Sequence, residues 1–416
     1  MIQKPRGTQD YLPEKAELWQ YLEKRASNWF ERYGYRRIIT PTFESTDLFT
    51  RSIGPSTDIV QKEMYTFKDK KGRSLTLRPE GTAPIVRAYL EDKLDQEAKP
   101  VKLYYIGPMF RYERPQAGRY REFYQMGVEA LGSQDPSLDA ETIHLFISYL
   151  DDLGLTGLEL DINSMGCRKD RVEYSKKLKE YLSTTEVCET CSKRTDMNPL
   201  RIFDCKNKKC RESIKNAPKL IDFICDRCRK HFEQVQKYLK DLGVDYSLNP
   251  NLVRGFDYYT RTTFEVVSSS LGSQDALGGG GRYDYLIEDY GGSKTPAIGF
   301  AFGLERIELA LKKQNITMSE RIPLKALMVY YNEEAKQIAF EAMSKLREEG
   351  LSIDMDYESK SFKAQLKLAN KKQVPYVLIV GPEEIKKEVF LVKDMKKGEQ
   401  KEVGLVEASK ILKGLN

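Results

Sequence analysis

The chain has 416 residues, of which 40% are hydrophobic and 31% charged, and this length allows two or three folded domains with a substantial core. Its sequence has no run of about 18 apolar residues, and the N-terminal Met1–Gly7 lacks the apolar core of a secretory signal, so we expect a cytoplasmic protein without membrane contact. With only two histidines, His144 and His231, catalysis by a histidine base is an unfavourable hypothesis.

The net charge of +6 is concentrated in one segment. Residues 165–250 contain 20 Lys and Arg against 13 Asp and Glu, whereas the rest of the chain is close to neutral. A basic segment in a neutral chain indicates contact with a polyanion such as nucleic acid. A lysine-rich solvated surface is the alternative explanation.

The first 320 residues predict clustered strands joined by hairpins, which favour an α+β domain on an antiparallel sheet. This domain should comprise residues 1–166 and 246–320, interrupted by a basic, cysteine-rich insertion at 167–245. Apolar periodicity and Gly/Pro positions predict helices at 13–33, 83–93, 136–153 and 303–313, and strands at 36–41, 74–78, 103–110, 158–162, 253–259, 262–267 and 297–302.

Residues 111–129 predict the tip of a β-hairpin whose facing strands carry Arg111, Glu113, Arg119, Arg121 and Phe123. Arginine forks bind phosphate oxygens in pairs, and a phenylalanine ring offers a stacking face to a base. The combination is typical of a nucleoside triphosphate site. A charged, solvated loop with one core phenylalanine is the alternative.

Six of the seven cysteines fall within 41 residues of the insertion, in the spacings Cys188-x2-Cys191, Cys205-x4-Cys210 and Cys225-x2-Cys228. Two Cys-x2-Cys pairs indicate a structural zinc site. We expect Cys188, Cys191, Cys225 and Cys228 as ligands, with Cys205 and Cys210 as spare or alternative ligands. Reduced cysteines without metal are the alternative.

Residues 253–261 place Arg254 between apolar neighbours in a strand-like run. A half-buried arginine needs an anionic partner, which is a protein carboxylate or a ligand. Tyr258 and Tyr259 follow each other, so in a strand only one of them would face a given pocket.

Four successive glycines at 278–281 indicate a bulge or sheet edge that approaches a small substrate closely. Further along, Arg306 is expected in the first turn of a helix after strand 297–302. The carboxylates Glu80 and Glu129 could accept hydrogen bonds from an amine or a ring N–H.

Beyond a polar linker at 315–323, strands and helices alternate over residues 325–416. This alternation predicts a small α/β domain with a mixed, mostly parallel sheet. Strands are expected at 325–331, 352–357, 376–380, 387–393 and 399–405, with helices at 333–349, 361–372 and the C-terminus.

The chain resembles the class II aminoacyl-tRNA synthetases, and within them the histidyl-tRNA synthetase family, over its whole length. The helix and strand ending at Pro41 resemble class II motif 1, Phe110–Glu113 with the loop to Phe123 resembles motif 2, and Gly299–Arg306 resembles motif 3. Family-specific blocks are Leu252–Tyr259 and Ala276–Asp284, with further matches at Pro5–Thr8 and Arg78–Thr82.

The resemblance implies an ATP-dependent ligase of protein biosynthesis that binds L-histidine, ATP with Mg²⁺ and tRNA(His), works as a homodimer and carries an anticodon-binding domain at 325–416. For ATP it implies Arg111 at the α-phosphate, Arg121 and Arg306 at the β/γ end, Glu113 at the adenine edge and Phe123 stacked on its face. For histidine it implies Glu80, Thr82 and Gln125 at the amino group, Glu129 and Tyr259 at the imidazole, Tyr258 lining the pocket and Arg254 at the carboxylate and the α-phosphate. Gln116 and Arg119 would face the tRNA acceptor end, and the insertion would hold the acceptor stem.

Two alternatives lie within this resemblance. One is a non-catalytic regulatory paralogue of histidine biosynthesis, which typically lacks the C-terminal domain and the arginines, and the other is a class II synthetase for another amino acid. Both are disfavoured here, the first by residues 325–416 together with the retained arginines and the second by the two family-specific blocks.

Overall fold

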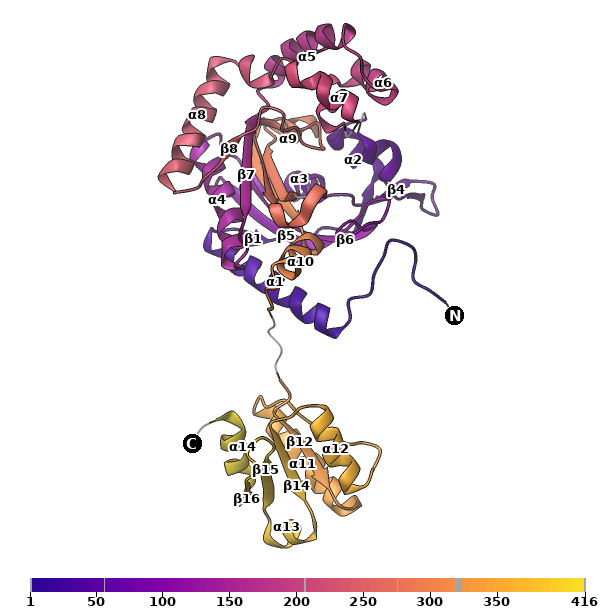
Figure 1. Ribbon diagram of the computed structural model, residues 1–416, viewed down its shortest axis with the longest axis vertical. Coiled ribbons are helices and arrows are strands. Elements are labelled where there is room, and N and C mark those ends of the chain that lie inside the picture. The colour runs from indigo at the N-terminus through magenta and orange to yellow at the C-terminus, as the bar shows by residue number, and fades with distance from the viewer. Residues whose placement is uncertain (1, 56, 206, 275, 319–322, 415–416) are drawn as a thin grey trace. The chain divides into compact units, whose positions relative to one another are not determined.

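The computed structural model describes residues 2–55, 57–205, 207–274, 276–318 and 323–414. The chain divides into two units, Met1–Ser319 and Glu320–Asn416, which are described separately (Figure 1). The linker expected at 315–323 lies partly outside the described residues. Among those residues, none of the helices combines the length and the apolar character needed to cross a bilayer.

The first unit is built on an eight-stranded sheet in the order β1-β5-β6-β11-β10-β9-β7-β8. Adjacent strands are antiparallel except at the two edges, where β1 is parallel to β5 and β8 is parallel to β7. These strands are β1 (Arg36–Arg37), β5 (Val101–Phe110), β6 (Glu122–Leu131), β7 (Leu158–Ser164), β8 (Ser247–Leu248), β9 (Thr260–Ser268), β10 (Ala276–Arg282) and β11 (Ala297–Gly303). A second, three-stranded sheet contains β2 (Phe43–Ser45), β4 (Ser74–Leu77) and β3 (Thr66–Lys68).

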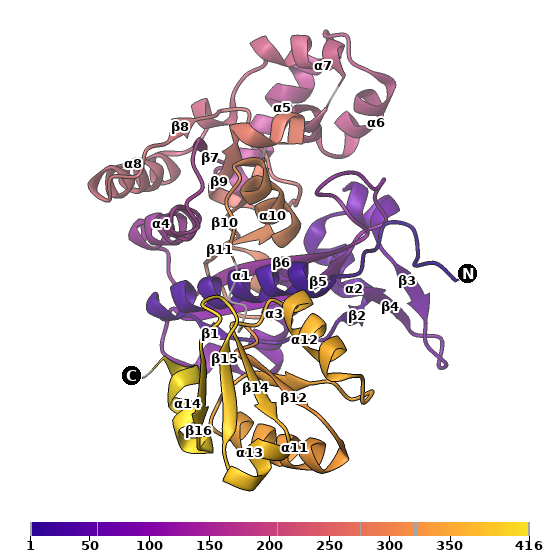
Figure 2. The same cartoon turned by 60° about the horizontal axis from the view of Figure 1, so that its bottom comes forward.

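Helices cover both faces of the large sheet (Figure 2). The helices of this unit are α1 (Pro13–Arg32), α2 (Thr46–Ile53), α3 (Thr82–Glu91), α4 (Pro136–Asp152), α5 (Arg168–Ser183), α6 (Glu189–Met197), α7 (Lys208–Ser213), α8 (Asp226–Asp241), α9 (Leu286–Asp289) and α10 (Leu304–Lys313). One core joins α1, α4 and α10 to the sheet through side chains such as Phe30, Phe146 and Ile307. In a second core, α3 packs against a different set of strand residues, which includes Leu103 and Tyr105 of β5.

Local sequence explains where the main helices begin and end. α1 starts with Pro13, whose fixed φ suits a first helical position, and it is followed by Gly34 at φ +80°. α4 also starts with proline, and the Asp135 side chain accepts the Ser137 amide N–H at 2.9 Å. The expected helices at 13–33 and 136–153 are therefore confirmed to within a residue.

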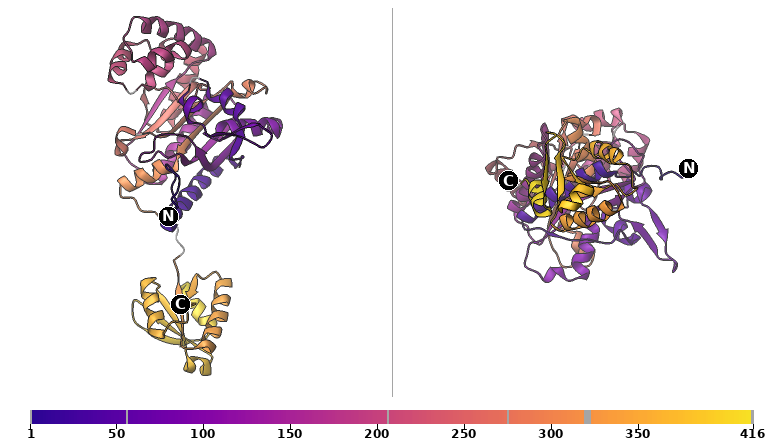
Figure 3. Two further views of the ribbon diagram at one scale, coloured as in Figure 1. Left: turned by 90° about the vertical axis from the view of Figure 1, so that its right-hand side faces the viewer. Right: turned by 90° about the horizontal axis from the view of Figure 1, so that it is seen from below.

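The insertion is helical and has a core of its own. Its helices α5, α6 and α7 gather beyond one end of the large sheet, and α8 returns along α4 (Figures 1 and 3). The core contains Tyr174, Leu178 and Ile224 together with the buried Cys191, Cys210 and Cys228. The insertion belongs to the first compact unit, Met1–Ser319. A separate insertion domain at 167–245 therefore stays a proposal.

The second unit has a five-stranded mixed sheet in the order β13-β12-β14-β15-β16. The first three strands are parallel and the last two are antiparallel to their neighbours. Its elements are β12 (Ala326–Tyr330), α11 (Glu333–Glu348), β13 (Ile353–Met355), α12 (Phe362–Lys371), β14 (Tyr376–Val380), α13 (Pro382–Lys387), β15 (Phe390–Asp394), β16 (Gln400–Val403) and α14 (Leu405–Lys413). Helices α11 and α14 pack against one core and α12 against another.

Three differences from the sequence predictions concern the middle of the large sheet. Residues 253–259 form bends and turns rather than a strand, although β9 follows at Thr260 as expected. The glycine run lies in β10, between β9 and β11, and is not a sheet edge, although the ladder to β9 has the expected irregularities. β5 ends at Phe110 and β6 begins at Glu122, so the arginines expected on the hairpin strands lie in the loop between them.

Candidate active site

A cavity of about 410 Å³ opens over the middle of the large sheet. It is bounded by the β5–β6 loop, the start of α3, the irregular segment 253–259, β10 and the junction of β11 with α10. Most of the predicted site residues line it: Glu80, Thr82, Arg111, Glu113, Arg119, Phe123, Gln125, Glu129, Arg254, Tyr258, Tyr259 and Arg306. Residues as far apart in the sequence as Glu80 and Arg306 therefore meet at one place.

Three arginines from distant segments share this cavity. Arg111 follows β5, and its Nε donates to the Pro79 carbonyl oxygen at 2.9 Å while its guanidinium lies 5.1 Å from the Phe123 ring centre. Within the described part of the chain its terminal nitrogens have no hydrogen-bond or ion-pair partner. These nitrogens are the donors that a phosphate group would need.

Arg254 and Arg306 are held by different partners, a β9 carboxylate and a β10 carbonyl. Arg254 forms an ion pair with Glu265, but its Nε is buried without a hydrogen-bond partner. Arg306 donates to the Ala276 carbonyl oxygen, and burial lowers the pKa of its guanidinium. A buried donor without a partner costs about 1–3 kcal/mol, so the site is incomplete until a ligand accepts from it.

The carboxyl group of Glu129 forms the polar end of a buried slot. It accepts hydrogen bonds from the Thr82 hydroxyl at 2.7 Å and the Tyr283 hydroxyl at 2.5 Å. Burial raises the pKa of Glu129 to about 8, and the two hydroxyl donors lower it only in part. No Cβ fits at Gly299, where it would overlap the Glu129 carboxylate.

Glu80 lies beside this slot at the first turn of α3. Its carboxylate accepts the backbone N–H groups of Thr82 at 2.6 Å and Ala83 at 2.8 Å. Burial raises the pKa of Glu80, and the two amides oppose that rise. Gln125 lines the same cavity with its Oε1 buried and unpartnered.

Sequence reasoning was wrong about the tyrosine pair and missed two other residues. Tyr258 and Tyr259 both line the cavity because residues 253–259 are not a strand, so side chains do not alternate. Tyr283 was not expected to contact Glu129, and Glu265 was not expected as the partner of Arg254. Tyr283 lies one residue beyond β10, and its position after the glycine run was the only signal for it.

Two predicted residues do not line the cavity. The Arg121 guanidinium lies 3.8 Å from the ring centre of Tyr112, and its Nε donates to the Glu113 carbonyl oxygen at 3.3 Å. Gln116 forms a two-residue bridge with Arg119 in the β5–β6 loop, and Arg119 forms an ion pair with Glu113. Their expected ligand contacts would require this loop to rearrange.

The zinc site expected at Cys188, Cys191, Cys225 and Cys228 is wrong as a single site. In the structure Cys188 and Cys191 lie with Cys205 and Cys210, whereas Cys225 and Cys228 lie with Cys167 and Asp170. The sequence reasoning paired the two equal spacings. The fold instead brings each Cys-x2-Cys pair to a different partner segment.

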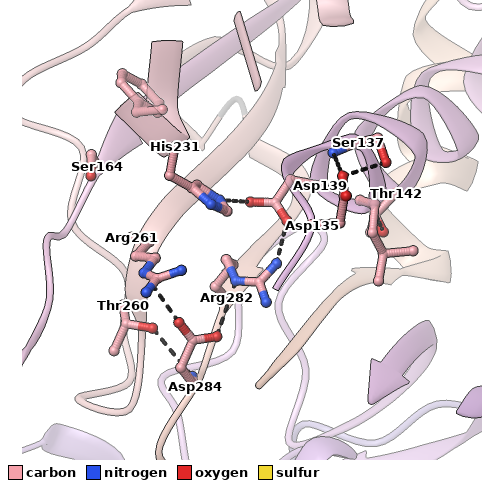
Figure 4. Close-up of polar contacts among 12 residues, drawn as sticks. Asp135, Ser137, Asp139, Thr142, Ser164, His231, Thr260, Arg261, Arg282 and Asp284 are labelled. Carbon is pink, nitrogen blue, oxygen red and sulfur yellow. Dashed lines mark hydrogen bonds and ion pairs between the residues drawn. The ribbon is translucent and has the colours of Figure 1, made fainter. Parts of the chain in front are cut away.

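A buried polar network joins the returning helix of the insertion to the catalytic sheet (Figure 4). His231 on α8 contacts the Asp139 carboxylate on α4 at 2.8 Å, and Asp139 also forms an ion pair with the fully buried Arg282. Arg282 donates to Asp284 at 3.0 Å, and Arg261 lies 3.4 Å from the other oxygen of Asp284. The network thus fixes α8 against α4 and the ends of β9 and β10.

The antiparallel sheet, the hairpin arginine beside a phenylalanine, and a second arginine on the helix after β11 together define the catalytic domain of a class II aminoacyl-tRNA synthetase. Comparison with known proteins agrees. The chain matches the family described as Histidyl-tRNA synthetase over residues 7–307 and that described as Anticodon binding domain over residues 318–415. The chain belongs to the histidyl-tRNA synthetase family.

Similar proteins extend over nearly the whole chain. A protein named Histidine–tRNA ligase from Halothermothrix orenii is 51% identical over 406 residues, which cover 97% of each chain. Another of that name from Natranaerobius thermophilus is 50% identical over 404 residues, or 96% of each. The crystal structure of the apo histidyl-tRNA synthetase of S. aureus superposes with a TM-score of 0.85 at 38% identity, covering 99% of this chain and all of the other.

Proposed function

We propose that this cavity activates L-histidine with ATP and that the histidyl group is then transferred to the 3′ end of tRNA(His). The observation that carries the proposal is the meeting of Arg111, Arg254 and Arg306 in one cavity, next to the buried Glu129 slot. A triphosphate needs several cationic donors, and an imidazole needs a buried hydrogen-bonding partner. Family membership supports the same activity.

ATP is proposed to bind along the arginines, with Arg111 at the α-phosphate and Arg306 at the β/γ end. The Phe123 ring lines the cavity beside Arg111 and would stack on adenine, and Glu113 in the same cavity would accept from the adenine amine. Arg121 joins the β/γ end only if it leaves Tyr112. Mg²⁺ is bound mainly by phosphate oxygens and would neutralise part of their charge, and the cavity carboxylate of Glu265 fits a hard cation there.

Histidine is proposed to bind with its ring toward Glu129. Tyr259 and Tyr283 complete the imidazole contacts, and Tyr258 packs beside the ring. The α-amino group would lie at Glu80, Thr82 and Gln125. Thr82 begins α3 and Glu80 lies just before it, and the unpartnered Gln125 Oε1 would accept from the amino group. Arg254 would then donate its free Nε toward the histidine carboxylate.

The reaction follows from this arrangement. A carboxylate oxygen of histidine attacks the α-phosphorus of ATP in line, the bond to the β-phosphate oxygen breaks, and pyrophosphate leaves. A terminal ribose hydroxyl of the tRNA then attacks the activated carbonyl carbon and AMP leaves. Arg111 and Arg254 stabilise the charge that develops on the α-phosphate oxygens, and little covalent work falls to the protein.

The tRNA is proposed to contact three parts of the chain. Gln116 and Arg119 of the β5–β6 loop would meet the acceptor end, and the basic insertion at 167–245 the acceptor stem. Residues 325–416 would bind the anticodon, which agrees with the matched domain at 318–415. The catalytic domain would then comprise 1–166 and 246–320.

A homodimer in the cytoplasm is proposed as the working form. Ile39 in the motif 1 segment is 79% exposed, and Phe43 and Phe67 of the three-stranded sheet are 51% and 44% exposed. Burying such side chains against a second copy is favourable. Sedimentation of the apo protein would show a dimer that Ile39→Asp together with Phe43→Asp converts to a monomer, and a wild-type monomer at micromolar concentration would contradict it.

The test of the function is pyrophosphate exchange with each of the twenty amino acids, followed by charging of tRNA(His). Exchange is expected with histidine alone, and charging is expected only with tRNA(His). Exchange with another amino acid would indicate a different synthetase. A protein that binds histidine without exchange or charging would be a regulatory paralogue.

A further inference from the structure

All seven cysteines of the chain fall into two compact clusters in the insertion and at its base. The first contains Cys188, Cys191, Cys205 and Cys210, and the second contains Cys167, Asp170, Cys225 and Cys228. Within each cluster the possible ligand atoms all lie within 4.8 Å of one another. The proposed histidine, ATP and tRNA contacts use none of these residues.

The first cluster (the distal cluster) has the geometry of a tetrathiolate site. The Cys188 and Cys205 sulfurs are 3.9 Å apart, and the Cys188 amide donates to the Cys210 sulfur at 3.1 Å. A zinc–sulfur bond of about 2.3 Å places neighbouring sulfurs of a tetrahedron about 3.8 Å apart, whereas a disulfide needs about 2.05 Å. Cys191 and Cys210 are buried, so the cluster lies inside the packed core of the insertion.

The second cluster (the basal cluster) combines two pairs of residues that have the same spacing in the sequence. Cys167-x2-Asp170 lies at the start of α5, and Cys225-x2-Cys228 lies at the start of α8, so each pair begins a helix whose N-terminus favours negative ligands. Gly166 turns the chain at φ +58°, and a Cβ there would collide with Asp170. Helices α5 and α8 are the first and last of the insertion, so the cluster ties its entry to its exit.

Asp170 supplies the second reason to place a cation here. Its side chain is buried, and its carboxylate accepts the Cys167 amide at 3.0 Å. No Lys, Arg or His of the described chain forms an ion pair with it. A buried carboxylate surrounded by three thiols needs a positive partner, and zinc accepts thiolate and carboxylate ligands together.

We propose that each chain holds two zinc ions, one bound by Cys188, Cys191, Cys205 and Cys210 and the other by Cys167, Asp170, Cys225 and Cys228. Both sites have four protein ligands and are therefore structural. The distal zinc holds α6 and α7 together, where short helices offer little apolar surface. The basal zinc fixes both ends of the insertion beside Arg261 and Asp284, which share a small cavity with Cys167, Cys225 and Cys228.

The test is the zinc content of the full-length protein, purified under reducing conditions without chelator and measured by elemental analysis. Two zinc ions per chain are expected. Cys188→Ser with Cys191→Ser should remove one, and Cys225→Ser with Cys228→Ser the other. Asp170→Asn should weaken the basal site alone, whereas the matched control Asp226→Asn, one residue after Cys225 and exposed, should retain both ions.

Two further measurements keep the proposal falsifiable if a variant does not fold. Cobalt replacement should give tetrahedral thiolate spectra with stronger charge-transfer absorption from the distal site than from the basal one. Thiol titration of the denatured, unreduced protein should find seven free thiols. Wild-type protein that retains well under one zinc after reloading with Zn²⁺, shows paired loss of thiols through disulfides, or carries iron and sulfide instead, overturns it.

Discussion

At the scale of single residues, the site depends on buried charges that the protein alone leaves incompletely satisfied. Arg254 has one buried nitrogen without a partner, and Gln125 has one such oxygen. Such groups are rare in folded proteins because each costs stability. These two residues come from distant segments and line the same cavity, where a polar ligand could satisfy them.

Replacing Arg254 by alanine should lower histidine-dependent pyrophosphate exchange by about a hundredfold or more, because a donor to the charge developing on the α-phosphate is lost. The effect should appear mainly in kcat. Arg73→Ala is the matched control, since Arg73 is exposed and pairs with the nearby Asp69. Near-normal exchange by Arg254→Ala would remove this residue from the proposed mechanism.

Glu129 should make the stability of the apo protein depend on pH. Its pKa of about 8 lies above the ordinary glutamate value, so the folded state binds its proton more tightly than the unfolded chain does. Its contribution is therefore fully present below about pH 4.5 and is lost as pH rises toward 8, at up to about 1.4 kcal/mol per pH unit.

The measurement is the free energy of unfolding by urea from pH 5.5 to 9, compared between wild type and Glu129→Gln. Wild type should lose stability relative to the variant up to about pH 8 and then remain parallel to it. Glu80 and Glu305 also have raised pKa values, but they are present in both proteins and cancel in the difference. A difference that does not change with pH would show that Glu129 is ionised throughout.

At the scale of elements, two neighbouring residues at the end of β10 contact two different parts of the molecule. Arg282 points into the buried network with Asp139, while Tyr283 donates to Glu129 at the cavity. One short stretch therefore connects the base of the insertion to the buried slot at Glu129.

Replacing Arg282 by methionine should destabilise the protein by about 3 kcal/mol, because Asp139 would remain buried with less compensation. This loss of stability is small for a broken buried ion pair, because His231 still contacts Asp139 and Arg261 still lies near Asp284. Arg36→Ala, which breaks the exposed pair with Glu97, should cost less than about 1 kcal/mol. Equal losses in the two variants, measured by urea unfolding, would mean that the network adds nothing beyond a surface pair.

Sequence patterns predicted the elements that are long and periodic. The helix at 13–33, the hairpin of β5 and β6, and the junction of β11 with α10 follow from apolar spacing and turn residues alone. Residues 253–259 were expected as a strand because apolar and aromatic residues alternate there. The structure uses the same aromatic side chains to line a cavity from an irregular segment, and no local pattern distinguishes these two uses.

The proposed metal ligands show the same limit. Equal spacing favoured a pairing of the two Cys-x2-Cys segments, but the partner of each is decided by how the helices of the insertion pack. Asp170 has the same spacing from Cys167 as Cys228 has from Cys225. The sequence does not indicate that these two pairs lie together, whereas the structure does.

At the scale of the whole molecule, the chain has two units with separate cores. The proposed amino-acid and ATP contacts all belong to the first unit. The two chemical steps should therefore depend differently on the second unit.

A chain that ends at Met318 should keep histidine-dependent pyrophosphate exchange but lose about a hundredfold in tRNA charging. This factor corresponds to about 2.7 kcal/mol of lost contacts with RNA. The comparison is made with the full chain at the same tRNA concentration, with circular dichroism to show that the shortened protein is folded. Unchanged charging would exclude anticodon binding by residues 325–416, and loss of exchange in a folded chain would show that the units are not independent.

The glycine strand constrains any attempt to redesign this pocket for other amino acids. Gly278 and Gly279 present bare backbone to the cavity, and a Cβ on Gly279 would overlap the Phe264 carbonyl and approach the Arg254 guanidinium to 3.0 Å. Any substitution at Gly278 or Gly279 therefore adds atoms to this side of the cavity, and none can enlarge the cavity there. A larger or differently shaped noncanonical amino acid would have to be accommodated by trimming the aromatic wall at Tyr258, Tyr259 and Tyr283, and laboratory evolution should concentrate its diversity there.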